Sequence, residues 1–311
     1  MSVRHILDIS DLAVHELHDV LALAQVPVAQ LGAPLSGHCA ALIFEKPSNR
    51  TRHSMEVAVV QLGGHPVYTR GEEVGIDVRE TAEDVAQVMA GYHAFLGARV
   101  FQHDVVQRMA AVSSVPVVNM LSDIAHPLQA LADVLTMQQQ HGNLQGKRIS
   151  WVGDFNNVAK SLAQACVMLG AEFVVSTPPE YRPSDSELAA INSLGKGSVQ
   201  YLPAPAEAVK GSVAVHTDVW ISMGEESVAA QKAAAFAGFM VTQHLMTNAQ
   251  QGACFYHCLP AHRGVEVEAG VIDGPNSRVY EQAHNRLHSA RGLLAWIFQQ
   301  QSAAVKESAQ S

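Results

Sequence analysis

RISWVGDFNNVAKSLAQACVMLGAEFVVS, residues 148–176, carries the clearest indication of the fold class. Residues 148–152 and 171–176 are short apolar runs of the kind that form buried strands. Between them, a Gly-Asp-Phe-Asn-Asn turn at 153–157 leads into an amphipathic segment, residues 158–169, that predicts a helix. Strand, helix and strand in this order form a βαβ unit, which predicts a parallel sheet covered by helices on both faces.

The same alternation continues on both sides of this unit. Further apolar runs predict strands at residues 39–44, 65–68, 95–101, 115–119, 213–215 and 254–257. Helical patterns occupy residues 8–25, 52–62, 80–93 and 285–299, while residues 69–79 read as a loop. The polar segment 142–147 is the best candidate for a domain boundary. We therefore expect an α/β fold with two domains, each a parallel sheet flanked by helices.

Composition limits the class of protein. The chain has 311 residues, of which 48% are hydrophobic, and a formal net charge of −9, which argues against nucleic-acid or anionic-membrane partners. The sequence has neither a run of about 18 apolar residues nor the apolar core of a signal peptide at its start. Four cysteines (Cys39, Cys166, Cys254 and Cys258) in a chain of this size fit a reducing compartment. We expect a cytoplasmic enzyme.

FEKPSNRT, residues 44–51, predicts an anion site. An apolar run enters a Ser/Asn/Thr-rich turn that opens a helix, and a helix start offers free N–H groups and the positive end of the helix dipole. Ser48 and Thr51 add hydroxyls, and Arg50 and Arg52 add guanidinium groups that match phosphate oxygens. The alternative is a capped helix with two surface arginines, and the segment is not a Walker motif.

Other polar residues stand close to predicted strand ends. Arg99 near the end of an apolar run needs a partner, either a protein acid or a ligand oxygen, because an unpaired buried charge is costly. His126, which precedes a proline, and Gln129 are predicted to cluster at a helix start, where they can polarise a carbonyl. Asn156 and Asn157 follow a strand at the edge where α/β proteins bind ligands, but no G-x-G-x-x-G supports a dinucleotide there.

The C-terminal half adds an acid, a thiol and another arginine. Asp218 is placed to hold an amino group. Residues 254–263 contain two cysteines and two histidines, which suggests zinc, but neighbouring strand residues point to opposite faces and no second cysteine pair has zinc-ribbon spacing. We therefore expect no metal and favour a lone thiol for Cys258. With the arginine in residues 285–288, these groups suit a phosphate-bearing substrate and an amine, without a cofactor.

Seven motifs occur in the order found in carbamoyltransferases: FEKPSNRTR, ARVF, HPLQALAD, GDFNNVAKS, TDVWISMGEE, HCLPAHRG and NRLH. The chain resembles this family from about residue 2 to about residue 299, and TDVW…SMG with HCLPAHRG is similar to its ornithine branch. The resemblance implies a carbamoyl-phosphate-binding domain at residues 1–141, an ornithine-binding domain at 142–284, and a C-terminal helix, 285–311, that packs back on the first domain. It also implies a homotrimer, or a multiple of trimers, with active sites at subunit interfaces.

The resemblance further assigns site residues by position. Those matching carbamoyl-phosphate ligands are Ser48, Asn49, Arg50, Thr51, Arg99, His126, Gln129, Cys258, Leu259 and Arg286. Those matching ornithine ligands are Asn157, Asp218, Ser222 and Met223. Arg99, His126 and Cys258 are the expected catalytic residues, with Thr51 helping Arg99 and His126 to stabilise the oxyanion.

The implied reaction is carbamoyl transfer from carbamoyl phosphate to the δ-amine of L-ornithine, which gives L-citrulline and phosphate and belongs to arginine metabolism. The alternatives are a transcarbamylase for an N-acylated ornithine or putrescine, and a non-catalytic homologue that binds ligands. Three positions depart from the family pattern: Asn49 replaces threonine, His284 replaces glutamate, and Gly75 in the altered loop 69–83 stands where a glutamine often reaches the neighbouring subunit.

Overall fold

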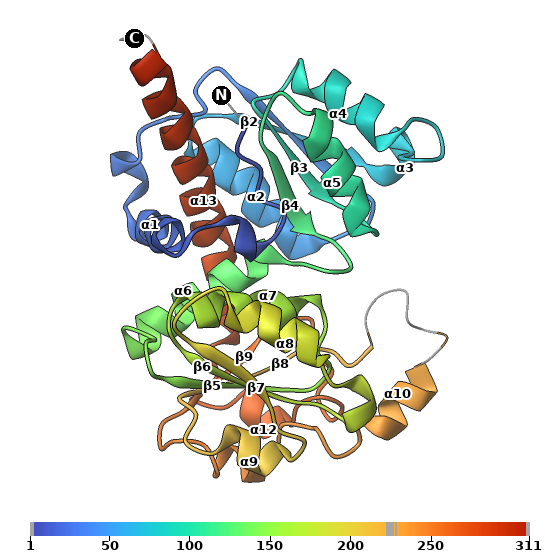
Figure 1. Cartoon of the computed structure of the whole chain (residues 1–311), viewed down its shortest axis with the longest axis vertical. Helices are drawn as coiled ribbons and strands as arrows, with labels where there is room; N and C mark the ends of the chain where they lie inside the picture. The colour runs from blue at the N-terminus through green and yellow to red at the C-terminus, as the bar shows by residue number, and fades with distance from the viewer. Residues whose placement is uncertain (1–2, 222–226, 228, 309–311) are drawn as a thin grey trace. The chain divides into compact units, whose positions relative to one another are not determined.

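The computed structural model describes residues 3–221, 227 and 229–308, and the chain divides into two compact units. Unit 1 comprises residues 1–132 and 285–311, and unit 2 comprises residues 133–284. Each unit contains one parallel sheet flanked by helices (Figure 1), so the expected fold class is confirmed. The domain boundary expected at 142–147 stays a prediction. Among the described residues, no helix is long and apolar enough to cross a membrane.

Unit 1 is built on a four-stranded sheet in the order β2-β1-β3-β4, with every neighbouring pair parallel. Its strands are β1 (Cys39–Phe44), β2 (His65–Arg70), β3 (Phe95–Arg99) and β4 (Val117–Leu121). Its helices are η1 (Ile9–Asp11), α1 (Val14–Gln25), η2 (Val28–Gln30), α2 (Asn49–Gln61), α3 (Gly71–Val74), α4 (Ala82–Ala90) and α5 (His103–Val112). Helices α6 (Pro127–His141) and α13 (Val279–Ser308) belong partly to each unit.

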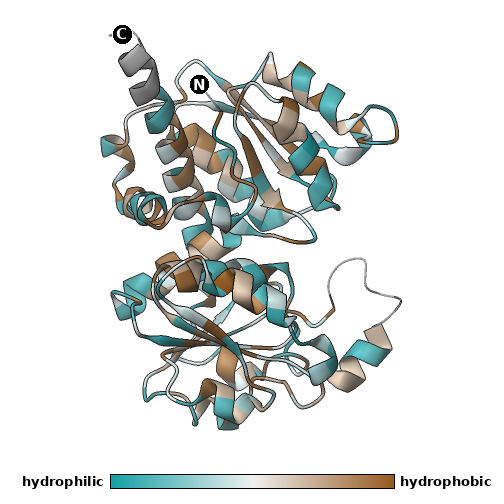
Figure 2. Cartoon of the chain, viewed as in Figure 1, coloured by the Kyte–Doolittle hydropathy of each residue, from teal (hydrophilic) through white to brown (hydrophobic). Residues whose placement is uncertain are grey.

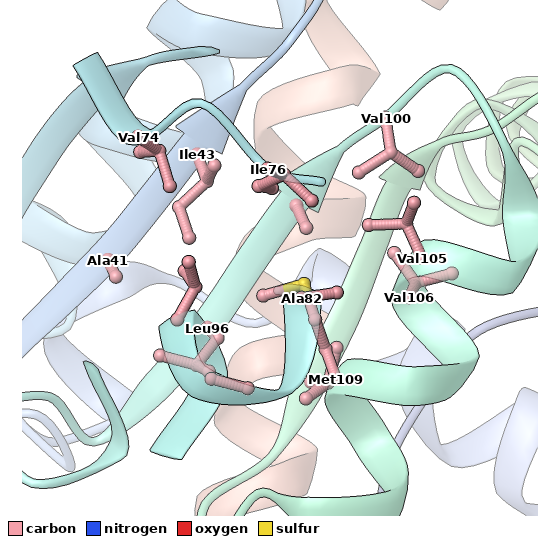
Figure 3. Packing of buried hydrophobic residues seen from close by; sticks show 14 residues of the cluster. Ala41, Ile43, Val74, Ile76, Ala82, Leu96, Val100, Val105, Val106 and Met109 are labelled. Atoms are coloured by element: carbon pink, nitrogen blue, oxygen red, sulfur yellow. The ribbon is translucent and has the colours of Figure 1, made fainter. Parts of the chain in front are cut away.

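The two faces of this sheet are covered by different helices. Leu96 of β3 belongs to a hydrophobic cluster with Ile43 of β1 and Met109 of α5, which fills the space between the sheet and helices α4 and α5 (Figure 3). Its neighbour Phe95 points to the opposite face, because successive side chains of a strand alternate. There it meets Phe298 of α13, with ring centroids 6.3 Å apart. Arg99 ends this buried strand, next to a register shift in the β3–β4 ladder.

The C-terminal helix packs closely on α1 of unit 1. A Cβ atom at Gly292 would lie 2.6 Å from the backbone nitrogen of Ala24 and 2.7 Å from the carbonyl of Val20, so only glycine allows this approach. Beside it, Arg291 donates hydrogen bonds to Gln61 (2.8 Å) and to the carbonyl of Ala24 (3.2 Å). The predicted return of this helix to the first part of the chain is confirmed.

Unit 2 contains a five-stranded parallel sheet in the order β7-β6-β5-β8-β9. Its strands are β5 (Arg148–Val152), β6 (Glu172–Ser176), β7 (Ser198–Tyr201), β8 (Ala214–Thr217) and β9 (Cys254–His257). Its remaining helices are α7 (Asn157–Met168), η3 (Pro179–Tyr181), α8 (Asp185–Asn192), α9 (Pro205–Val209), α10 (Ala229–Ala235), α11 (Gln243–Met246) and α12 (Ala269–Ile272). The βαβ unit predicted at 148–176 is present as β5-α7-β6.

Helices α7 and α8 cover one face of the second sheet, and α9 and α12 cover the other (Figure 1). On the latter face, Val215 and Phe255 pack with Val209 and Ile272 in one apolar cluster. Figure 2 shows hydrophobic colour along the strands and mixed colour on the covering helices. Because the strands are parallel, β5, β8 and β9 all end at one edge of the sheet, where the turn at 153–157, Asp218 and Cys258 follow them.

Candidate active site

The start of α2 forms the anion-binding feature expected in unit 1. Ser48 caps the helix, its hydroxyl accepting a hydrogen bond from the backbone N–H of Thr51 at 3.3 Å. Asn49 and Arg50 occupy the first two helical positions, where N–H groups have no partner within the helix. The first turn holds no acidic residue, so the positive end of the dipole is not neutralised there.

Arg286 joins three segments that are far apart in the sequence. Its guanidinium donates one hydrogen bond to the side-chain oxygen of Gln129 and another, of 3.0 Å, to the hydroxyl of Thr51. All three side chains are buried, and they come from α13, α6 and α2. Both partners are neutral, so they fix the direction of the guanidinium without cancelling its charge.

A second buried cation, Arg99, lies close to His126. Burial lowers the pKa of His126 well below its ordinary value of 6.5, and the charges of Arg286 and Arg99 lower it further. The imidazole is therefore neutral at physiological pH. A neutral imidazole among cations can donate a hydrogen bond to a carbonyl oxygen without needing a carboxylate to balance a charge of its own.

Lys46 lies inside FEKPSNRT, but the sequence pattern did not identify it as part of the predicted anion site. Its ammonium lies 4.5 Å from the ring centre of Phe101. Burial lowers the pKa of Lys46, and the nearby Arg99 lowers it too, while Asp123 and Glu45 act in the opposite direction. The electrostatic influence of Arg99 on both Lys46 and His126 places these groups around one arginine at the carboxyl edge of the first sheet.

The altered loop of unit 1 is more ordered than its sequence suggests. It contains α3 and two left-handed residues, Gly75 (φ 65°) and Asp77 (φ 58°). Arg108 of α5 holds it through ion pairs to Asp77 and to Glu83, the latter at 3.0 Å. Val78, between these anchors, is 93% exposed. The loop therefore presents an apolar side chain on a backbone that ion pairs restrain.

In unit 2 the structure joins the predicted acid and thiol. The Cys258 thiol donates to Asp218 Oδ1 at 2.9 Å, and Asn156 donates its side-chain N–H to Asp218 Oδ2, also at 2.9 Å. Asn156 caps α7, whereas the family resemblance assigned its neighbour Asn157 to ornithine. Asn157 begins the same helix, at the same edge of the sheet. Asp218 is 7% exposed, so its carboxylate is held in one orientation at the end of β8.

The turn after β9 is fixed by His257. Leu259 has a left-handed backbone (φ 58°), which is uncommon for a residue with a branched side chain. Its N–H donates to His257 Nδ1 at 2.9 Å, while His257 Nε2 lies 3.2 Å from Glu266 Oε1. Although burial raises the pKa of Glu266, the hydrogen bonds from His257 and from the backbone of His262 lower it overall. His257 is thus a donor at Nε2 and an acceptor at Nδ1, which orients the residues on either side of Cys258.

Asp218, His257 and Cys258 lie close enough for their donor atoms to suggest a metal site, all within 4.8 Å of one another. The hydrogen bonds argue against that use. Both ring nitrogens of His257 are engaged within the protein, and Cys258 donates its proton to Asp218. A metal would have to break these contacts before it gained a ligand.

The predicted site residues fall into two groups, each described within its own unit. Unit 1 brings Thr51, Gln129 and Arg286 into contact, and unit 2 brings Asp218 and Cys258 into contact. Ser222 and Met223 lie outside the described residues. Close to them in sequence, Lys232 of α10 forms a 2.7 Å ion pair with Asp154 in the turn after β5. The ligand roles of all these residues stay predictions.

Comparison with known proteins identifies the family. The chain matches the sequence profile of the aspartate/ornithine carbamoyltransferase carbamoyl-P binding domain at residues 4–139, and that of the Asp/Orn binding domain at residues 145–297. It is 44% identical to an ornithine carbamoyltransferase of Hyperthermus butylicus, over 94% of this chain and 97% of that protein. It is 41% identical to an anabolic ornithine carbamoyltransferase of Pyrococcus furiosus, over 94% of this chain and 96% of that protein.

The solved structures agree with the sequence matches. An ornithine carbamoyltransferase structure from Pyrococcus furiosus superposes with a TM-score of 0.89 at 40% identity, covering 95% of this chain and 97% of the other. The expected resemblance is thereby confirmed over nearly the whole length. The chain belongs to the aspartate/ornithine carbamoyltransferase family and is a transferase.

Proposed function

We propose that this protein transfers the carbamoyl group of carbamoyl phosphate to the δ-amine of L-ornithine and releases L-citrulline and phosphate. The observation that carries the proposal is that each unit of this family member contains one set of groups, a half-site, suited to one of the two substrates. Unit 1 holds buried cations around a neutral histidine, and unit 2 holds a thiol against a carboxylate. The first set suits an acyl phosphate, whose carbonyl it can polarise, and the second suits an amine.

Carbamoyl phosphate binds to unit 1 in this proposal. The start of α2, with Ser48, Asn49, Arg50 and Thr51, takes the phosphate oxygens through N–H groups, hydroxyls and a guanidinium. Arg286 adds a guanidinium that Thr51 and Gln129 already orient, so little ordering is needed when the anion arrives.

In this proposal the carbamoyl carbonyl is polarised by Arg99 together with His126 and Thr51. As the amine attacks, negative charge develops on the carbamoyl oxygen, and Arg99, His126 and Thr51 stabilise that charge. Because His126 is neutral, it contributes a hydrogen-bond donor and does not compete with the arginines for the phosphate. Preorganised donors of this kind contribute several kcal/mol to many acyl transfers.

Ornithine binds to unit 2 in this proposal. Asn157 takes the α-carboxylate and Asp218 the α-ammonium, and the resemblance assigns Ser222 and Met223 to ornithine as well. The δ-amine, beside Cys258 and Leu259, must react in its neutral form, which is scarce at neutral pH by analogy with lysine. Its nitrogen bonds to the carbamoyl carbon while the bond from carbon to the phosphate oxygen breaks, and phosphate leaves with that electron pair. The amine nitrogen then loses a proton, which balances the charge of the departing phosphate and ends on it as hydrogen phosphate.

The proposal extends to the cellular setting and the assembly. We infer a cytoplasmic enzyme of arginine biosynthesis, a direction supported by the similarity to the anabolic enzyme of Pyrococcus furiosus. We also infer a homotrimer, or a multiple of trimers, in which the 69–83 loop reaches a neighbouring subunit; the support is the exposed Val78 on a restrained loop. A protein that is strictly monomeric by light scattering and still fully active would contradict the assembly.

The domain assignment belongs to the same proposal. Residues 1–141, with the C-terminal helix 285–311, form the carbamoyl-phosphate-binding domain, and residues 142–284 form the ornithine-binding domain. The two family profiles, at 4–139 and 145–297, support the order of these domains along the chain.

A colorimetric ureido assay tests the function. The purified protein is supplied with carbamoyl phosphate and, in separate reactions, ornithine, N-acetylornithine, putrescine or aspartate. We expect ornithine to exceed each of the others by at least about 2 kcal/mol in kcat/KM, because the other amines leave polar groups of the site unpaired. Faster turnover of another amine would replace ornithine as the substrate, and the absence of turnover with all four would favour a non-catalytic homologue.

A further inference from the structure

Gln282 of α13 is a fully buried amide that contacts three segments of unit 2. Its side-chain oxygen accepts a hydrogen bond from the backbone N–H of His257 at 2.9 Å. Its nitrogen donates to Asp133 Oδ1 of α6 at 2.7 Å and lies 2.9 Å from His216 Nε2. His216 belongs to β8 and His257 to β9, so one side chain binds the carboxyl ends of two neighbouring strands.

The hydrogen-bond chemistry fixes the orientation of this amide. If the amide were reversed, its oxygen would face the Asp133 carboxylate and its N–H₂ group would face the N–H of His257, which are two repulsive contacts. In the observed orientation, one N–H serves Asp133 and the other serves His216. His216 Nε2 also lies 3.4 Å from Asp133 Oδ2, but the amide nitrogen of Gln282 is nearer, at 2.9 Å. His216 Nε2 is therefore an acceptor, and its Nδ1–H donates to the carbonyl of Thr217 at 3.0 Å. Both donors and the acceptor of Gln282 are thus satisfied.

His216 is also held on both ring faces. The indole of Trp151 stacks on the imidazole with centroids 4.8 Å apart and an interplanar angle of 17°. The ring of Tyr256 stacks as well, at 6.3 Å and 11°. Gln282 contacts one edge of the imidazole and the Thr217 carbonyl contacts the other, so the ring is held in one position relative to β8. The contact with Gln282 therefore links this amide to the end of β8.

The reactive pair of the second half-site stands just beyond these contacts. The β8–β9 ladder ends at the pairing of Thr217 with His257, and Asp218 and Cys258 are the next residues on the two strands. In the part of the chain that the structure describes, the β8–β9 pairing does not continue beyond this pair. Besides Asn156 at the carboxylate and His257 at the turn, the 2.9 Å distance from thiol to carboxylate depends on how far apart the two strand ends lie, and Gln282 hydrogen-bonds to both strand ends and to Asp133.

We propose that Gln282 is a positioning residue that sets the distance between the Cys258 thiol and the Asp218 carboxylate. It touches neither substrate itself. Its part in turnover rests on the proposed function, whereas its effect on the thiol can be measured without any turnover. Loss of the amide should leave β8 and β9 formed but let their carboxyl ends move apart. The Cys258 thiol would then lose its hydrogen bond to the Asp218 carboxylate.

Alkylation of Cys258 by iodoacetamide, followed by peptide mass spectrometry over a range of pH, tests the proposal on the full chain. We expect Gln282→Met to raise the alkylation rate of Cys258 at least fivefold at pH 8 and to shift its pH profile, since a thiol that donates to a carboxylate is slow to become a thiolate. Cys39, in unit 1 and half-buried, provides an internal control that should stay within twofold. Gln164→Met, which removes a similarly buried amide from α7, provides the matched variant.

Kinetics then separate positioning from general damage. KM for ornithine should rise at least fivefold in Gln282→Met, while the affinity for inorganic phosphate, which reports on unit 1, stays within twofold. A folded Gln282→Met protein whose Cys258 rate is within twofold of the unchanged protein would overturn the proposal. If the unchanged protein lacks transferase activity, the proposed function fails, and the alkylation result still decides the role of Gln282.

If Gln282→Met does not fold, two further variants test the same contact: Gln282→Glu alone, and Gln282→Glu combined with Asp133→Asn. Gln282→Glu sets two carboxylates against each other at Asp133 and should free the Cys258 thiol. Adding Asp133→Asn restores one amide and one carboxylate to this contact, and should return the Cys258 rate to within about threefold of the unchanged protein. A double variant as reactive as Gln282→Glu alone would show that this contact does not hold the strand ends.

Discussion

The two half-sites use the same edge of similar sheets for opposite electrostatic tasks. Unit 1 gathers the cations Arg99 and Arg286, both 5% exposed or less, beside the half-buried Lys46. Unit 2 places a carboxylate, Asp218, against a thiol at 2.9 Å. The parallel sheet therefore determines where a site forms, while the residues after each strand determine which charge the site accepts.

The two half-sites also differ in the hydrogen-bond partners that orient their charged side chains. Arg286 donates to neutral partners from distant helices, Gln129 and Thr51, and neither of these two contacts cancels its charge. The Asp218 carboxylate is already engaged by Cys258 and Asn156, so it offers a ligand only its remaining acceptor capacity. We expect losses in unit 1 to act through charge and losses in unit 2 through orientation.

The largest effect is expected from Arg286→Ala. It removes a buried guanidinium and leaves Gln129 and Thr51 without their donor. We expect kcat/KM for carbamoyl phosphate to fall by at least about 3 kcal/mol, or more than a hundredfold, because charge on the transferring group is then less stabilised. Steady-state kinetics at saturating ornithine measure this loss.

Arg291→Ala is the matched control on the same helix. Arg291 is equally buried, but its hydrogen bonds go to Gln61 and to the carbonyl of Ala24, so its loss should lower the free energy of unfolding by about 1 to 3 kcal/mol. We expect its kcat/KM to stay within about threefold. Equal kinetic losses in the two variants would mean that α13 contributes packing, and not a phosphate ligand.

A smaller effect is expected in unit 2 from Asp218→Asn, which keeps the shape of the side chain and removes its charge. We expect kcat/KM for ornithine to fall by at least about 2 kcal/mol, because the α-ammonium loses its counter-charge and the thiol loses a charged acceptor. Isothermal titration with inorganic phosphate should give an unchanged affinity. A weakened phosphate affinity would contradict the independence of the two half-sites.

The sequence predicted those strands that require a local apolar pattern. The apolar runs at 39–44, 148–152 and 254–257 coincide with β1, β5 and β9, because buried parallel strands need continuous apolar residues. The strand β7, Ser198–Tyr201, was missed because it lies at the sheet edge and alternates exposed and buried residues over only four positions. Local hydrophobicity does not distinguish such a segment from a loop.

Distant partners could not be predicted from the sequence. Arg286 was selected as a possible anion ligand, but its bond to Thr51 joins residues 235 positions apart. Gln282 gave no local signal at all, and its partner Asp133 is 149 positions away. In the GDFNN turn, both asparagines fitted the pattern, and only the cap geometry of α7 showed that Asn156 is the one that holds Asp218.

The smallest expected effect concerns pH and belongs to His126. Burial and two arginines lower its pKa in the folded protein, whereas in the unfolded chain its pKa is close to 6.5. Below pH 6.5 the unfolded state therefore binds a proton that the folded state does not, so this histidine reduces the free energy of unfolding as the pH falls towards its folded pKa. Above pH 6.5 neither state is protonated, and the effect is absent.

His126→Gln removes this difference in proton binding and keeps a side-chain hydrogen-bond donor. We expect the free energy of unfolding of the unchanged protein to fall by about 1 kcal/mol more than that of the variant between pH 6.5 and 5.5, as urea titrations at the two pH values can measure. The other histidines are common to both proteins and cancel in the comparison. Parallel pH dependences would show that the fold does not lower the pKa of His126, so that the imidazole takes up a proton over the same pH range in the folded and the unfolded chain.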